Sequence, residues 1–212
     1  MRVTDIILAR TVWLLDVAHL NHKGIALGVV HRALLERYRF INVPQLGPES
    51  FEGKGGITYG SGEFEFNGSP VSVGLTVYSD GCWGDSVLTT EVSDAFLNDL
   101  SQWLVSTFSF RDPRQLITRP FYDSRLYLES DVMLNDISEK VRLFSELLRT
   151  HTGNTTEEAW ALLFEPDGGN TSFSFERRAN VPFANKQYFS KALLSTERHI
   201  ELLNHFEEIF KT

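Results

Sequence analysis

Three potential metal ligands, Asp16, His19 and His22, lie three residues apart near the start of the chain. Carboxylate oxygens and imidazole nitrogens are ligands that proteins use for zinc and iron. Positions three residues apart on a helix turn away from one another by about 60° at each step, so the three could share an ion only where the backbone bends. The spacing matches no established metal motif. We therefore predict a strand end and a polar turn here, and keep a metal site as the alternative.

The single cysteine, Cys82, is another side chain whose type could do chemistry. A catalytic cysteine needs a base or a positive charge beside it to lower the pKa of the thiol, and the neighbouring sequence Asp-Gly-Cys-Trp-Gly supplies neither. The motifs Gly-x-Ser-x-Gly, His-Glu-x-x-His and paired Cys-x-x-Cys do not occur. We predict no catalytic residue and no cofactor, and we expect Cys82 to be a small residue in a turn beside a buried tryptophan.

The segment 111–125 is the one stretch with a positive balance, because it holds four Arg against two Asp. Arginine suits forked contacts with carboxylate or phosphate groups, and arginine with aromatic residues is enriched in interface cores. Pro113 and Pro120 exclude a regular helix. The predicted partner-binding residues are Arg111, Arg114, Arg119, Tyr122 and Arg125. The alternative is a set of solvated linker charges that contribute little.

The elements that position these residues follow from hydrophobic periodicity and from Gly and Pro signals. Helical spacing of apolar residues predicts helices over 25–40, 90–108, 136–150 and 196–210. Apolar or alternating segments predict strands over 10–17, 57–66, 71–78, 125–128, 160–164, 171–177 and 188–194. Asn67-Gly68 predicts a hairpin turn, and 80–85 a further turn. The fold class is α+β, with a mostly antiparallel sheet and helices packed on one face.

The inward faces of three helices can be assigned from the same spacing. Trp103 and Phe206 are each predicted to point into the core from the helices over 90–108 and 196–210. On the helix over 136–150, the residues predicted to point inward are Ile137, Val141, Phe144 and Leu148.

An internal duplication is predicted from the element order, which is β-α-β-β-α before the Arg segment and the same order with one additional strand before the last helix after it. Residues 88–100 match residues 194–206 without gaps, at an offset of half the chain length. We predict two related βαββα halves, 1–110 and 126–212, joined by the Arg-rich linker 111–125 into one compact domain. Two ordinary capped helices would resemble each other as well, so chance similarity is the alternative.

Composition excludes several classes of protein. The 212 residues are 42% hydrophobic, and 16 Phe, 4 Trp and 6 Tyr supply ample surface for a core, which excludes disorder. One cysteine excludes a disulfide scaffold. No apolar run approaches the ~18 residues of a membrane span, so we expect a cytoplasmic protein without membrane contact. The net charge of −8 argues against unspecific binding of nucleic acid.

These observations favour a non-enzymatic protein-interaction or accessory subunit of a larger assembly, whose partner is another protein or a second copy of the chain. One alternative is an enzyme that binds a small ligand or a metal in a pocket between the two halves, where pockets often form. Another is contact with nucleic acid through Arg111–Arg125, which the acidic remainder of the chain opposes.

Overall fold

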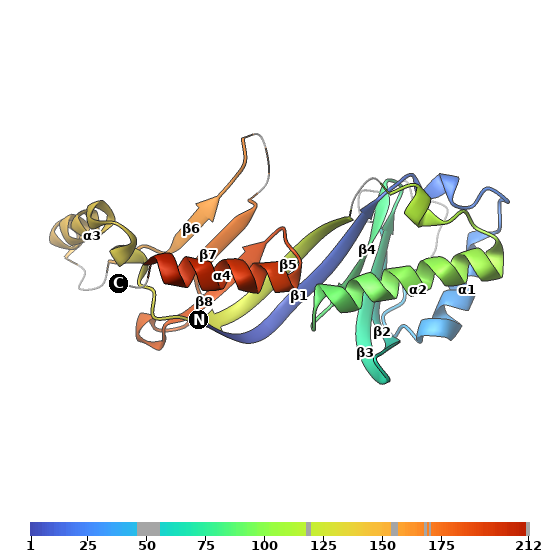
Figure 1. Ribbon diagram of the computed structural model, residues 1–212, viewed down its shortest axis with the longest axis horizontal. Coiled ribbons are helices and arrows are strands. Elements are labelled where there is room, and N and C mark those ends of the chain that lie inside the picture. The colour runs from blue at the N-terminus through green and yellow to red at the C-terminus, as the bar shows by residue number, and fades with distance from the viewer. Residues whose placement is uncertain (46–55, 118–119, 154–156, 168, 170, 211–212) are drawn as a thin grey trace. The chain divides into compact units, whose positions relative to one another are not determined.

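The structure is a computed structural model that describes residues 1–212 except 46–55, 118–119, 154–156, 168, 170 and 211–212 (Figure 1). The chain divides into two compact units. The first unit is Leu8–Asp123, and the second unit is Met1–Ile7 together with Ser124–Thr212. The chain therefore passes from one unit to the other inside two strands, β1 (Arg2–Leu14) and β5 (Pro120–Glu129).

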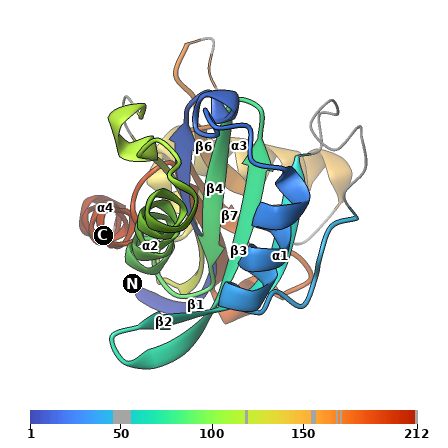
Figure 2. The same cartoon turned by 90° about the vertical axis from the view of Figure 1, so that its right-hand side faces the viewer.

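The first unit is a four-stranded antiparallel arrangement in the order β2-β3-β4-β1. Its further elements are η1 (Val17–His19), α1 (Leu27–Tyr38), β2 (Ile57–Phe66), β3 (Ser69–Tyr78), β4 (Gly81–Ser86), α2 (Thr90–Phe108) and η2 (Pro113–Gln115), where η marks a 3₁₀ helix. The helices α1 and α2 lie on the same face of these strands (Figure 2). Helices packed on one face of antiparallel strands are typical of an α+β protein.

The expected hairpin at Asn67-Gly68 is confirmed, because both residues have positive φ angles, 51° and 76°, and join β2 to β3. The expected turn over 80–85 is wrong. This segment is strand β4, which pairs with both β1 and β3. The glycines of β4 make its sequence resemble a turn. At Gly84 the reason for glycine is the close packing of α2, because a Cβ there would lie 3.0 Å from Leu97 and 3.1 Å from Phe96. Glycine is required there for close packing and not for chain reversal.

The second unit repeats the element order of the first: strand, helix, three strands, helix. Its elements are β5, η3 (Leu134–Ile137), α3 (Glu139–Thr152), β6 (Ala161–Phe164), β7 (Phe173–Arg177), η4 (Phe183–Asn185), β8 (Gln187–Ala192) and α4 (Thr196–Phe210). The strand order β5-β8-β7-β6 also corresponds position by position to that of the first unit. The first unit thus has one strand, β4, more than the predicted βαββα pattern, whereas the additional strand of the second unit, β8, was expected over 188–194. Descent by duplication stays a prediction.

A buried polar contact ties the C-terminal helix of each unit to its strands. In the first unit the Ser93 hydroxyl lies 2.9 Å from that of Thr11. In the second unit the fully buried His199 lies between two hydroxyls, with Nε2 2.9 Å from Ser190 Oγ and Nδ1 3.1 Å from Ser124 Oγ. Ser190 donates its own proton to a carbonyl, so its oxygen accepts from Nε2–H. Ser93 and His199 are separated by the same offset as the matching helix sequences.

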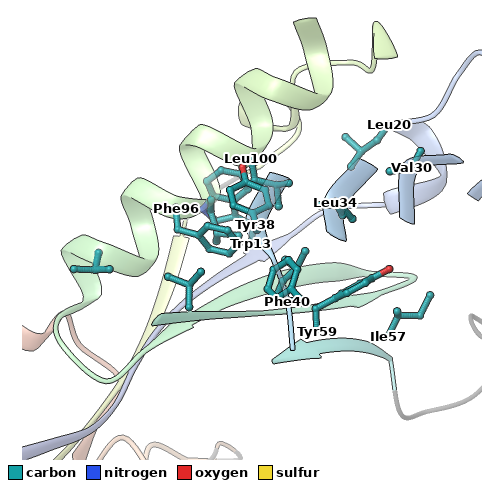
Figure 3. Packing of buried hydrophobic residues seen from close by; sticks show 14 of the residues in the cluster. Trp13, Leu20, Val30, Leu34, Tyr38, Phe40, Ile57, Tyr59, Phe96 and Leu100 are labelled. Carbon is teal, nitrogen blue, oxygen red and sulfur yellow. The ribbon is translucent and has the colours of Figure 1, made fainter. Parts of the chain in front are cut away.

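Each unit has its own hydrophobic core. Figure 3 shows that of the first unit, where Trp13 from β1, Tyr38 from α1 and Phe96 from α2 converge. In the second unit Phe175 stacks on Tyr188 at 4.5 Å between ring centres, and Phe206 of α4 packs on Phe175 at 4.8 Å. The described helices include none that is long and apolar enough to cross a membrane.

The predicted inward face of α3 is wrong at Val141 and Phe144, whereas Ile137, which lies in η3, packs against the core and Leu148 is half-buried. Phe144 is 60% exposed, and Val141 lies on the exposed side as well. Ser145 is the residue that α3 buries, and its hydroxyl bonds to the carbonyl of Glu157 and to Asn135. These polar contacts hold the helix with its apolar arc outward, which periodicity alone could not foresee.

Candidate ligand-binding cavity

The first unit contains a cavity of about 460 Å³ between its helices and the inner face of its strands. Apolar side chains form nearly all of its wall. They include Trp13 from β1, Val30 and Leu34 from α1, Tyr59 from β2, and Leu100 and Leu104 from α2. Figure 3 shows several of these side chains pointing toward one another from different elements.

Both α1 and α2 contribute to the wall of this cavity. Val30, Leu34 and Tyr38 recur every four residues along α1 and form its buried face. At the end of α1 the two helices are joined, because Tyr38 donates a hydrogen bond of 2.6 Å to Asp99 of α2 and Arg37 reaches the same carboxylate at 2.9 Å. The cavity is lined by the earlier part of α1, from Leu27 onward, where this junction does not hold the helices together.

The polar side chains at the cavity are few, and several of them are already hydrogen-bonded. Asp16 accepts a hydrogen bond from the backbone of Ala18 at 3.0 Å, and Asn21 binds the backbone of Ile25 through both ends of its amide. Ser101 donates to Asp112 at 3.3 Å. Among the described lining residues none is Lys, Arg or His. The wall therefore offers an anion no counter-charge, and it suits a neutral, apolar guest.

Cys82 lines the cavity from strand β4. Burial raises the pKa of its thiol to about 12, because the thiolate would lose its hydration. The thiol is therefore uncharged at neutral pH and is a poor nucleophile. The expected position in a turn is wrong, since Cys82 pairs within the sheet with Trp13 and Val77.

Two of the three candidate metal ligands lie together. The Nδ1 atom of His19 is 3.4 Å from a carboxylate oxygen of Asp16, and both side chains are more than half exposed. Asp16 also caps the short helix η1. His22 follows on the exposed surface. Among the residues that the structure describes, no group of three or more His, Cys, Asp or Glu side chains is placed to hold a metal ion.

The Arg segment is not a continuous linker. In the first unit Arg114 forms a forked pair with Asp112, with nitrogen–oxygen distances of 2.7 to 3.1 Å. This guanidinium lowers the pKa of the Asp112 carboxyl. Arg111 uses its backbone N–H to bind the carbonyl of Leu20 at 3.0 Å, and its side chain is exposed.

The remaining predicted partner-binding residues are placed elsewhere. Tyr122 and Arg125 belong to strand β5, and both have contacts within the protein. Arg125 lies in the second unit, whereas Arg111 and Arg114 lie in the first. Arg119 is outside the described residues. Binding of a partner by these five residues stays a prediction.

Sequence reasoning missed the cavity, because each of its apolar residues is also what an ordinary core would contain. The sequence does place several of the wall residues on the predicted inner faces of strands and helices. This pattern does not show whether the side chains fill the space between those faces. A scan against models of protein families matches none of them, and a search of curated proteins finds no match.

Proposed function

We propose that the protein is a non-enzymatic binding protein, and that its first unit takes up a neutral, apolar small molecule. The observation that supports this is the cavity of about 460 Å³ between α1, α2 and the inner face of the strands. Ligand pockets typically measure about 300–1,000 Å³ and have mostly apolar walls with few polar groups. The cavity meets both conditions.

The chemistry of the wall narrows the guest. Moving apolar surface out of water contributes roughly 25 cal/mol per Å², so a hydrocarbon guest gains free energy from nearly every contact here. A carboxylate or phosphate inside the cavity would be desolvated without a cation to pair with. Among the lining residues that the structure describes, the only charged one is Asp16, which is more than half exposed.

Catalysis is not part of this proposal. Burial raises the pKa of both potentially reactive lining groups, Cys82 and Tyr59, to about 12. Neither provides a base or a nucleophile near neutral pH. The Tyr59 hydroxyl is also engaged with Nδ1 of His31 at 2.9 Å.

The test is a fluorescence titration with N-phenyl-1-naphthylamine, an uncharged apolar probe that brightens out of water. Val77 lines the cavity, so Val77→Phe should fill part of it and weaken probe binding at least tenfold. Val12 lies on the same sheet but faces away from the helices, opposite Trp83, and Val12→Phe is the matched control. Equal probe binding by the two variants would exclude the cavity as the binding site.

A second candidate function is the interaction subunit expected from the sequence, with a second copy of the chain as partner. The observation that favours it is the exposed apolar arc of α3, formed by Val141, Leu143, Phe144 and Leu147. Two such arcs packed antiparallel would place Phe144 of each copy over Leu147 of the other. Sedimentation should then show a concentration-dependent dimer that Phe144→Glu abolishes, and a monomer at every concentration would exclude it.

A further inference from the structure

The outer face of the second unit, on the side of its strands away from α4, carries two cations in register. Arg125 of β5 is the direct cross-strand partner of Lys191 of β8. Ser174 of β7 continues the same row, opposite Lys191. Like charges placed directly opposite each other destabilise an antiparallel pair. Arg125 has contacts of its own, and the argument needs only its positive charge beside Lys191.

The corresponding position in the first unit holds a pair of opposite charges. There Arg10 of β1 is the direct partner of Asp85 of β4, and the two side chains form an ion pair of 2.5 Å. The strands β1 and β4 occupy in the first unit the places that β5 and β8 occupy in the second. The second unit therefore has a lysine where the corresponding row of the first unit has a carboxylate.

Aromatic side chains fill the next row of the same face. Tyr127 is the partner of Phe189, with ring centres 6.1 Å apart and an angle of 68° between the planes. The guanidinium of Arg178 lies 4.0 Å from the centre of the Tyr127 ring. Paired cations beside half-buried rings form a surface that can hold a phosphate and an aromatic base together.

Acidic side chains reduce the positive charge of this surface. Its charged side chains, including those at its edges, are Arg2, Asp123, Arg125, Glu129, Glu176, Arg178 and Lys191. Glu129 is already paired with Arg2. The four cations and three carboxylates leave a balance of one positive charge, and the whole chain has a net charge of −8. Binding of an anion here should therefore depend strongly on salt.

We propose that this face binds single-stranded nucleic acid, with a backbone phosphate at the Arg125–Lys191 pair and a base against Tyr127 and Phe189. A single strand fits better than a duplex, because only unpaired bases can stack on rings that lie within a sheet face. The proposal is independent of the apolar cavity in the first unit.

The test uses the full chain and a fluorescent oligothymidylate of about ten nucleotides, titrated at low salt. Lys191→Asp should weaken binding at least tenfold and reduce the salt slope by about one. It should not lower Tm, because the new carboxylate faces Arg125 as Asp85 faces Arg10. Lys140→Asp on α3 makes the same charge change away from this face and is the matched control.

Several results would overturn the proposal. These are absence of binding by the wild-type chain at low salt, an equal loss in Lys140→Asp, or a fall in Tm that accounts for the loss in Lys191→Asp. Equal affinity for a duplex would exclude recognition through the rings. Binding of labelled polyglutamate together with no binding of the oligonucleotide would assign the face to an acidic protein instead.

Discussion

Cys82 is half-buried at the cavity wall, and the reactivity of its thiol tests the raised pKa. Burial raises the thiol pKa from 9.0 to about 12, so at about pH 8 the thiolate fraction falls from about 10⁻¹ to about 10⁻⁴. Because thiolate is the reactive form, alkylation should be about 10³-fold slower in the folded protein than in the unfolded chain. The probe of the cavity should slow it further, since it would cover the sulfur.

The assay is alkylation with N-ethylmaleimide followed by mass spectrometry, where the single cysteine makes one adduct unambiguous. The same reaction in urea supplies the rate for the unfolded chain. Labelling of the folded protein within tenfold of that rate would refute the buried, uncharged thiol and would reopen a nucleophilic function. Cys82→Ser should leave binding of the apolar probe largely unchanged, because the substitution keeps the size of the side chain.

Three further predictions concern stability, each measured by urea denaturation. Phe206→Ala should lower the free energy of unfolding by about 3–5 kcal/mol, because Phe206 is only 7% exposed. Trp103→Ala should lower it by a smaller amount, because Trp103 is only partly buried. Equal losses in the two variants would contradict this. Glu158→Gln should lower the free energy of unfolding by about 3 kcal/mol, because the buried Arg177 would lose its ion-pair partner. A loss below about 1 kcal/mol would mean that water already screens the ion pair. Burial raises the pKa of Cys82 and Tyr59 in the folded state, so the free energy of unfolding should be highest below about pH 9 and should fall as the pH rises toward about 12. The expected fall is about 1.4 kcal/mol per pH unit for the Cys82 thiol, and Tyr59 adds to it at higher pH. An unchanged free energy of unfolding at about pH 10.5 would contradict this.

Local signals in the sequence were sufficient for most of the elements. Asn67-Gly68 supplies the positive φ angles of a hairpin with no help from the rest of the chain. The helix expected over 196–210 is α4, and Phe206 faces the core as its spacing predicts. The α+β class follows from such elements, because their periodicity depends only on the residues within each one.

The orientation of α3 shows where local signals stop. Its apolar residues recur at helical spacing and predict the helix correctly, but they do not say which side meets the rest of the unit. Contacts of Ser145 and Arg149 with the carbonyl of Glu157 settle that. Strand β4 is a similar case, because its glycines indicate a turn until the close approach of α2 is known.

The sequence by itself determined the residue types of the candidate sites and the elements that carry them. It predicted no activating neighbour for Cys82, and it drew attention to the cations around Arg125. Only the tertiary structure decided that Cys82 faces an apolar cavity, and that Arg125 lies opposite Lys191, 66 positions further along the chain. The physical reason is that helix spacing and strand register depend on contacts between residues distant in sequence, and one chain read alone carries no record of those contacts.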